Sequence, residues 1–199
     1  MSLAADSSEP KAFFMTAADL ISALNPLVPG ASFQALTPHD DAINPTILVP
    51  AEHLIATCRA LHDARGLEFV AFTDVTAADF FPNRDPRFDV VYHFVSPQRR
   101  ARVRLKVQVG FGQAVPTVQK IWAGAGWCER EVFDLFGIVF EGHDDLRRLM
   151  MPEDWEGHPL KKDYPVQVRK EADTFMPLQV TEEEFKSTLE RDRLVRPKP

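Results

Sequence analysis

Cysteine, long apolar runs and a basic N-terminus are scarce or missing in this sequence. Only two cysteines, Cys58 and Cys128, occur among the 199 residues, too few for a disulfide framework, a four-thiolate iron-sulfur cluster or a structural zinc site. No apolar run approaches the roughly 18 residues that span a bilayer. Residues 1–14 carry acids and lack the basic start of a secretory signal. We therefore expect a reducing compartment, no bound metal, and membrane association only through partners.

A strong charge of one sign is also missing. The formal net charge is -6 with acids and bases interleaved, which gives no long-range attraction to nucleic acid or anionic lipid. The sequence contains no P-loop, dinucleotide-binding glycine motif or nucleophile elbow. Apolar residues make up 45% of the chain and include 15 Phe, which is ample for a core. The 16 Pro include several from Pro152 onward, which predicts a compact body followed by an extended, Pro-rich end.

The hydrophobic periodicity predicts an α+β body over residues 16–140, with helices packed on a four- or five-stranded mixed or antiparallel sheet. Residues 1–15 are expected to be flexible. Thr16 and Asp19 form a capping box for the first helix, which ends at Asn25. The other expected elements are strands over 31–36, 46–49, 67–72, 88–95 and 101–109, helices over 51–65 and 127–136, and a short helix over 117–122.

The strand expected over 101–109 alternates strictly, with apolar residues on one face. Its other face carries a row of cations: Arg100, Arg102, Arg104 and Lys106. Tyr92, His93 and Phe94 on the neighbouring strand are candidate base-stacking groups, so a small RNA-binding module is one alternative. A solvated strand face is the commoner explanation, and the RNP-like and GXXG signatures of RNA-binding domains are missing.

The helix expected over 127–136 holds the candidate catalytic groups, and Gly124 and Gly126 form a hinge ahead of it. Glu131 and Asp134 have the spacing of paired carboxylates, but Arg130 is expected to neutralise Asp134 and no His lies at helical spacing. Cys128 falls on the apolar stripe. The better interpretation is an ion-paired helix face that docks on something, so we predict no catalytic, cofactor-binding or metal-binding residue.

Residues 141–199 are predicted to form an extended, partner-wrapping tail, with a terminal helix near 181–195 that Thr181 caps. Trp155 and Tyr164 are interleaved with Met, Leu and Arg before Pro165, which is the composition of an interface anchor. Ordering such a segment costs conformational entropy that a partner's apolar surface offsets. Folding back onto the chain's own body is the alternative.

One block resembles the signature of the 30-kDa subunit family of respiratory complex I, the NADH:quinone oxidoreductase. The block runs through Glu129-Arg130-Glu131, Phe136-Gly137-Ile138, Gly142-His143, Asp145–Arg148 and Pro159–Pro165. Asp144 is a departure, because the family usually has Pro there. The residues assigned to this signature and to a partner interface are Glu129, Arg130, Glu131, Asp134, Gly137, Gly142, His143, Asp145, Arg147, Arg148, Trp155, Pro159, Lys161, Lys162, Asp163, Tyr164 and Pro165.

The resemblance implies a non-redox, hydrophilic core subunit of the proton-translocating NADH:quinone oxidoreductase, which scaffolds the quinone-binding module of the peripheral arm. Its expected place is the cytoplasmic side of a bacterial inner membrane, beside the large quinone-cavity subunit and the subunit that carries the terminal iron-sulfur cluster. FMN, iron-sulfur clusters and quinone are expected on other subunits, and no nucleic acid is expected. The equivalent subunit of a membrane-bound hydrogenase or of a ferredoxin-driven quinone reductase is the near alternative.

Overall fold

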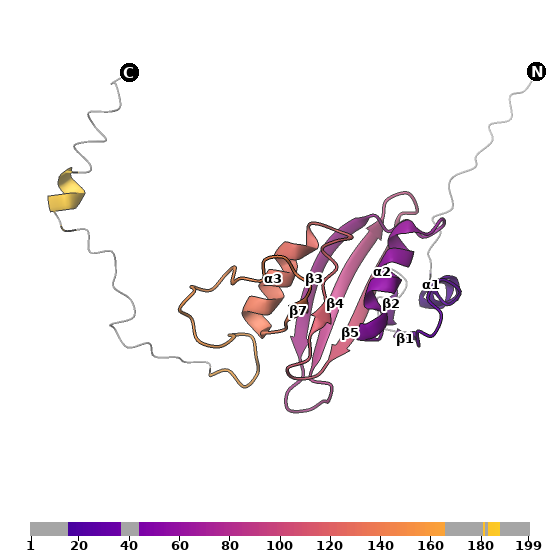
Figure 1. Cartoon of the computed structure of the whole chain (residues 1–199), viewed down its shortest axis with the longest axis horizontal. Coiled ribbons are helices and arrows are strands. Elements are labelled where there is room, and N and C mark those ends of the chain that lie inside the picture. Colours follow the sequence, from indigo (N-terminus) through magenta and orange to yellow (C-terminus); the bar gives the residue numbers. More distant parts are fainter. Residues whose placement is uncertain (1–15, 37–43, 166–180, 182, 188–199) are drawn as a thin grey trace, which may run out of the picture. The chain divides into compact units, whose positions relative to one another are not determined.

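A five-stranded mixed sheet is the frame on which the other elements are placed (Figure 1). The computed structural model describes residues 16–36, 44–165, 181 and 183–187. The strands are β1 (Gln34–Leu36), β2 (Thr46–Leu48), β3 (Ala71–Asp79), β4 (Phe88–Ser96) and β5 (Ala101–Val109) in the order β1-β2-β5-β4-β3. Only the β2–β5 pair of this sheet is parallel. Helices on a mixed sheet confirm the predicted α+β class.

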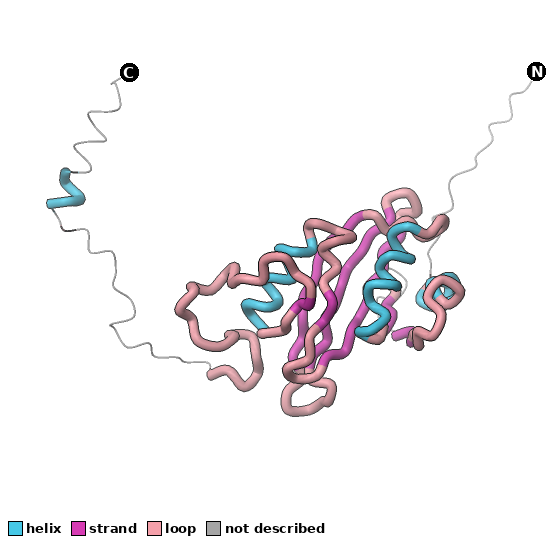
Figure 2. The backbone as a smooth tube through the Cα atoms, in the orientation of Figure 1, coloured by secondary structure: helices cyan, strands magenta, loops and turns pink. Residues whose placement is uncertain are grey.

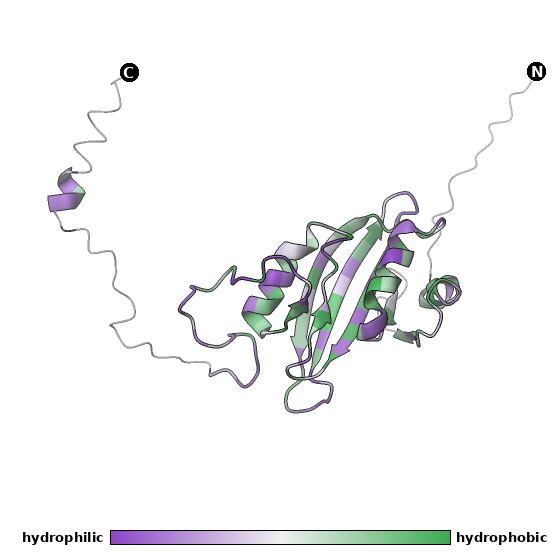
Figure 3. Cartoon of the chain, in the orientation of Figure 1, coloured by the Kyte–Doolittle hydropathy of each residue, from purple (hydrophilic) through white to green (hydrophobic). Residues whose placement is uncertain are grey.

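The alternation of β4 and β5 gives the sheet one buried face, visible as alternating bands in Figure 3. The register places Tyr92 opposite Leu105 and Phe94 opposite Val103, and all four are buried. Tyr92 and Phe94 therefore point into the core, and their predicted role in stacking on RNA bases is wrong. The β5 strand has the bounds that its period of two predicted.

Three helices complete the architecture. Helix α1 (Ala17–Leu24) begins with the predicted capping box, because the Thr16 hydroxyl accepts the Asp19 N–H and Asp19 Oδ2 accepts the Thr16 N–H. A 3-10 turn (Ala51–His53) precedes α2 (Leu54–Asp63), which buries Leu54, Cys58 and Leu61. Gly66 lies two residues beyond the α2 cap residue, Ala64, in the following turn with φ 102°, instead of capping the helix.

The strand predicted over 67–72 is misplaced. Glu68 adopts φ 49° and the Phe69 N–H donates to the Leu61 carbonyl, so residues 68–70 stay outside the sheet and β3 begins at Ala71. The hydrophobic pattern concealed the true strand, because Val75 and Ala77 share their buried face with an acid, Asp79.

The short helix predicted over 117–122 is a turn. The polar groups of this stretch are bound elsewhere: the Thr117 hydroxyl and the Val118 N–H both donate to Glu129. Trp122 stacks on Phe94 and donates its indole N–H to the Val70 carbonyl. These tertiary bonds leave the segment as a packed connection between the sheet and the next helix.

Helix α3 (Ala125–Phe136) starts two residues earlier than predicted, so Gly126 is helical and is not part of a hinge. Gly137 ends the helix with φ 74°, as expected for a left-handed cap. A small parallel pair, β6 (Val115–Pro116) and β7 (Phe140–Glu141), was not predicted, and it joins the segments on either side of α3. Among the described residues no helix is long and apolar enough to cross a membrane.

The first compact unit runs through Tyr164, beyond the boundary expected after Phe140, and the second begins at Pro165. In the second unit, residues 183–187 form a helical turn, and the Thr181 hydroxyl accepts the Glu184 N–H. The rest of the terminal helix predicted near 181–195, the Pro-rich tail and the flexible N-terminus fall outside the described residues.

Candidate functional site

Residues 141–164, called the return segment below, fold back along α3 and the edge of the sheet as a long irregular loop (Figure 2). Asp134 holds the middle of this segment. Its Oδ2 accepts three consecutive backbone N–H groups, from Leu149 at 3.0 Å, Met150 at 2.7 Å and Met151 at 2.8 Å. Burial alone would raise the pKa of this carboxyl, but the N–H donors and Arg148 lower it below its usual value. Asp134 is therefore a buried, ionised anchor.

The partner of Asp134 is not the one that the helical spacing predicted. Arg148 Nη1 donates to Asp134 Oδ1 at 2.7 Å, and Arg148 Nη2 donates to the Gly157 carbonyl at 2.9 Å. Arg130 instead donates to the carbonyls of Arg147 and Arg148. The prediction of a neutralising Arg130 is wrong because the return segment supplies a better placed guanidinium. The two arginines clamp the loop from both sides.

Gly137 and His158 form the next contact. A Cβ at Gly137 would lie 2.5 Å from His158 Cδ2, so the ring fills the space that a side chain would need. His158 Nδ1 donates to the Asp134 carbonyl at 2.8 Å, and the Leu160 N–H donates to the Leu135 carbonyl at 3.0 Å. Burial lowers the pKa of His158. The end of α3 is thus covered by a neutral imidazole and the backbone that follows it.

A second anchor binds the end of the return segment to the sheet. Arg87 donates to Asp79 through Nε at 2.8 Å and to Asp163 through Nη2 at 2.6 Å. The Lys162 N–H adds a bond to Asp79 Oδ2 at 2.9 Å. Burial alone would raise the pKa of Asp79, but these donors lower it to about 2. Residues 76 positions apart in the chain are joined here by charge-assisted bonds, the stronger kind.

A third cluster fixes the beginning of the return segment. Glu129 is fully buried and accepts the Thr117 hydroxyl at 2.5 Å and the Val118 N–H at 2.8 Å. His143 Nδ1 accepts the Asp145 N–H, so its Nε2 carries the proton and donates to the Gly126 carbonyl at 3.0 Å. Burial raises the pKa of Glu129 despite its hydrogen bonds and the nearby His143. This cluster ties α3 to the segments on both sides of it.

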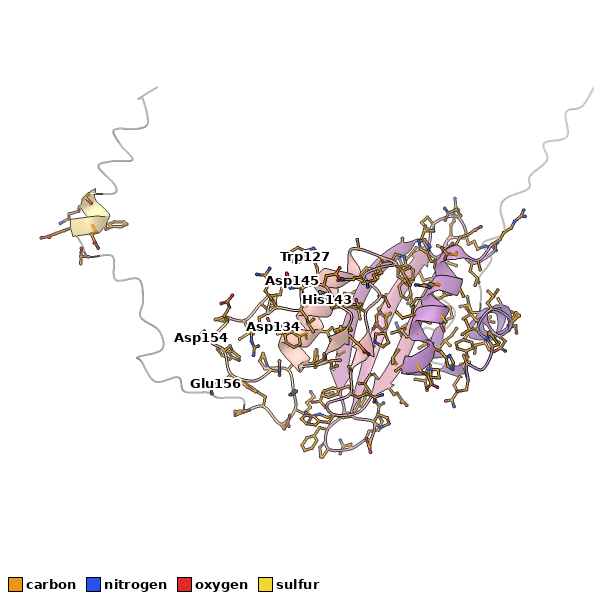
Figure 4. The ribbon with its side chains drawn as sticks, viewed as in Figure 1. Trp127, Asp134, His143, Asp145, Asp154 and Glu156 are labelled. Carbon is orange, nitrogen blue, oxygen red and sulfur yellow. The ribbon has the colours of Figure 1, made fainter. Side chains whose placement is uncertain are left out.

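The other signature residues lie around these anchors. Asp145 pairs with Arg147 at 2.7 Å on the surface, and Tyr164 donates its hydroxyl to the Glu156 carbonyl at 3.1 Å. Figure 4 shows Asp145 and His143 near the start of α3, while Asp154 and Glu156 lie on the bend farthest from the sheet. Gly142 is at φ 78°, Glu131 and Lys162 have exposed side chains, Trp155 and Pro159 are half-buried, Lys161 Nζ lies 5.1 Å from the Phe111 ring centroid, and Pro165 begins the second unit.

Several apolar side chains remain exposed along the same flank of α3. Trp127 is 62% exposed under the Arg130 guanidinium, and Met150 is 64% exposed beside the Asp134 anchor two helical turns away. Leu149 and Leu160 are also exposed. We call Trp127, Leu149, Met150 and Leu160 the apolar flank. Exposed apolar groups that cluster beside arginine are the composition of a protein interface.

The buried acids leave little capacity for catalysis. Asp79 and Asp134 have their oxygens filled by guanidinium and backbone donors, and Cys58 is buried, which raises the pKa of its thiol far above its usual value. Within residues 16–36 and 44–165, no three His, Cys, Asp or Glu side chains gather as a metal would require. The arrangement is suited to holding a loop in one conformation.

The sequence pattern did not reveal the body's half of these contacts: Asp79, Arg87 and Thr117. One signal was present, because Asp79 is in phase with the buried Val75 and Ala77. A buried carboxylate requires a cationic or N–H partner. Only distant parts of the chain could supply that partner, so the pairing with Asp163 was not readable from sequence spacing.

Comparison with known proteins gives consistent similarities. The family described as "Respiratory-chain NADH dehydrogenase, 30 Kd subunit" matches residues 47–170. A subunit of the NADH-quinone oxidoreductase of Methylobacterium radiotolerans is 40% identical over 172 residues, covering 82% of this chain and 80% of the relative. The protein of the same name from Sinorhizobium medicae is 46% identical over 121 residues, which are 61% of this chain and 60% of that relative.

The fold also occurs in a solved complex. A chain in the structure of a membrane-bound sulfane sulfur reductase, an archaeal respiratory membrane complex, matches with a TM-score of 0.60 and 21% identity. The match covers 75% of this chain and 85% of that one. At this identity the likeness shows the fold alone.

Proposed function

Because the chain belongs to the family of the respiratory-chain NADH dehydrogenase 30-kDa subunit, we propose that it is a hydrophilic core subunit of a proton-translocating NADH:quinone oxidoreductase. Its role is to scaffold the quinone-binding module of the peripheral arm. The first relatives are matched over 60% of their length, so this assignment of a whole-protein activity is part of the proposal.

The observation that carries the proposal is the way the signature residues are used. Asp134, Arg130 and Arg148 hold the return segment, and they do so with the apolar flank facing solvent. Fixing a loop in advance lowers the entropic cost of binding. A scaffold subunit needs such a preorganised surface, and the residues that an enzyme would keep accessible are here consumed by internal bonds.

We assign no catalytic residue and no redox centre to this chain. NADH oxidation and quinone reduction would take place on neighbouring subunits that carry FMN, iron-sulfur clusters and the quinone. The two cysteines support this assignment, because they are too few to ligate a cluster.

The proposed partners are the large quinone-cavity subunit, which the apolar flank and the residues after Pro165 would contact, and the terminal-cluster subunit. The proposed location is the cytoplasmic side of a bacterial inner membrane, with attachment through these partners. The bacterial relatives named as NADH-quinone oxidoreductase subunits support both assignments.

Affinity purification of the tagged full chain from its native membranes tests the proposal. We expect the quinone-module subunits to be recovered with it, together with NADH:quinone oxidoreductase activity in the eluate. Mass spectrometry identifies the recovered proteins. Recovery of the chain as a free monomer from membranes that contain active complex would refute the assignment. Recovery with hydrogenase subunits would replace it with the near alternative.

A further inference from the structure

The outer face of the sheet is a second surface that the signature residues do not use. Tyr92 and Phe94 turn toward Cys58 and Glu129, so α2 and α3 lie on the inner face. The alternation of β4 and β5 then puts the intervening residues on the other face. Their cross-strand pairs are Val91 with Lys106, His93 with Arg104 and Val95 with Arg102.

Three cations follow one another on this face of β5. Arg102 is exposed, and Arg104 and Lys106 are half-buried. Successive residues on one face of a strand are about 7 Å apart, so the three charges occupy a row about 14 Å long. Arg100 extends the row into the preceding turn with an exposed side chain. The chain as a whole has a net charge of -6, which makes this basic sheet face, defined by Arg100, Arg102, Arg104 and Lys106, an exception to its own surroundings.

At one end of the row an acid is shared between two cations. Asp89 Oδ2 lies 3.8 Å from Lys106 Nζ, and the same carboxylate also binds Arg84. Arg102 lies four residues from Lys106 along the strand, about 14 Å away, which is beyond the reach of that carboxylate. An anionic group brought to this face gains from charges that are already held in register by the sheet.

The remaining side chains on the face indicate what kind of anion fits. Val91 and Val95 are half-buried between the cations, which offers apolar contact beside the charge. Tyr92 and Phe94 lie on the buried side, so they give the bases of single-stranded RNA no stacking platform. Mixed apolar and acidic chemistry is the property of a protein segment.

We propose that the basic sheet face docks an acidic segment of a neighbouring protein subunit, as a second contact independent of the apolar flank. The proposal rests on the proposed function, because it presumes a multi-subunit assembly. It assigns to this chain a bridging role: one partner on the flank of α3 and another on the outer face of the sheet.

Zero-length cross-linking in the purified complex tests the contact directly. Arg102→Lys places a primary amine on the face, and a carbodiimide joins an amine to a carboxylate only when the two touch. We expect a new link from position 102 to an Asp or Glu of another subunit. Arg59→Lys, on the exposed side of α2, is the matched control and is expected to form no link to that residue. Links from position 102 to this chain's own acids alone, or none, would overturn the proposal.

Charge reversal supplies an independent measurement. The R102E/R104E/K106E chain is compared with R59E/R65E/K120E, which changes the same total charge at exposed cations elsewhere. We expect the first variant to be retained by the complex after a moderate-salt wash at about one tenth of the control level, because like charges then face each other. Equal retention of the two variants argues against the contact. Arg102→Glu alone, with a thermal melt of each chain, provides a variant that keeps the fold if the triple change does not.

The outcomes separate this inference from the proposed function. If the wild-type chain is not recovered with other subunits, the proposed function fails. If it is recovered but Arg102→Lys gives no link between subunits, only the docking of the basic sheet face fails. Low-salt binding of single-stranded RNA by the full chain, lost in R102E/R104E/K106E, would assign the face to nucleic acid and would also overturn the proposal.

Discussion

Buried carboxylates have a structural role in this molecule at the level of single residues. Glu129, Asp134 and Asp79 are each enclosed and each accept hydrogen bonds from a distant part of the chain. An isolated buried charge is costly, and removing one member of a satisfied set leaves the other members unpaired. Substitutions at these acids should therefore affect stability and loop order more than any chemical activity.

Asp79 should make stability depend on acid pH. Its pKa is lowered to about 2 in the folded chain, from an ordinary value of 3.8, so its contribution is complete above about pH 5 and is lost as the pH falls toward 2. The contribution is about 2 kcal/mol. Urea unfolding at pH 7 and pH 3 should show a smaller pH effect in Asp79→Asn than in wild type. Asp145→Asn, at an exposed pair, should leave the pH effect nearly unchanged. Equal pH effects in Asp79→Asn and wild type would contradict the assignment.

Asp134→Asn should loosen the return segment. The amide cannot serve Arg148 and three N–H donors as the carboxylate does, so we expect a loss of about 2–4 kcal/mol in the free energy of unfolding. Trypsin should then cleave faster at Arg147 and Arg148. Glu131→Gln, at an exposed position on the same helix, is the control and should behave as wild type. Unchanged cleavage in Asp134→Asn would show that Asp134 is not the anchor.

At the scale of elements, α3 is the support to which the return segment is fastened. Its inner side holds Glu129, its flank holds Asp134, and its end is closed by Gly137 and His158. The C-terminal cap thus has two functions: the left-handed φ stops the helix, and the missing side chain leaves room for the imidazole.

Gly137→Ala separates these two functions when it is compared with Gly112→Ala. Both glycines have positive φ, 74° and 76°, but a Cβ at Gly112 meets nothing within 4 Å. We expect Gly112→Ala to cost about 1 kcal/mol from backbone strain alone. Gly137→Ala should cost clearly more, because the His158 ring must move. Thermal melts of both variants measure the difference. Equal losses would mean that the ring yields freely.

The elements differ in how far the sequence predicted them. Helix α1 and strand β5 were predicted well because a capping box and strict alternation are local signals. The β3 strand was misplaced because its inward position 79 is an acid that a distant arginine neutralises. The docking block was recognised by its pattern, but its use inside the chain was not, because Asp134 and Asp79 obtain their partners only through tertiary contacts.

At the scale of the whole molecule, the first compact unit presents two surfaces of different chemistry. The apolar flank lies beside the clamped return segment, and the basic sheet face lies on the opposite side of the sheet from α2. A chain with internally satisfied acids and two presented surfaces is organised as a connector between neighbours. Its function should therefore fail at assembly before it fails at turnover.

The most direct test of this account is incorporation of a Trp127→Ala/Met150→Ala chain into the membrane complex. These are the two most exposed residues of the apolar flank, at 62% and 64%, and interface anchors of this kind cost about 2 kcal/mol or more each when truncated. Leu27→Ala, exposed elsewhere at 48%, is the control. The account predicts that the double variant folds with an unchanged melt but is recovered with the complex at least about tenfold less than the control. Equal incorporation of the two chains would contradict it.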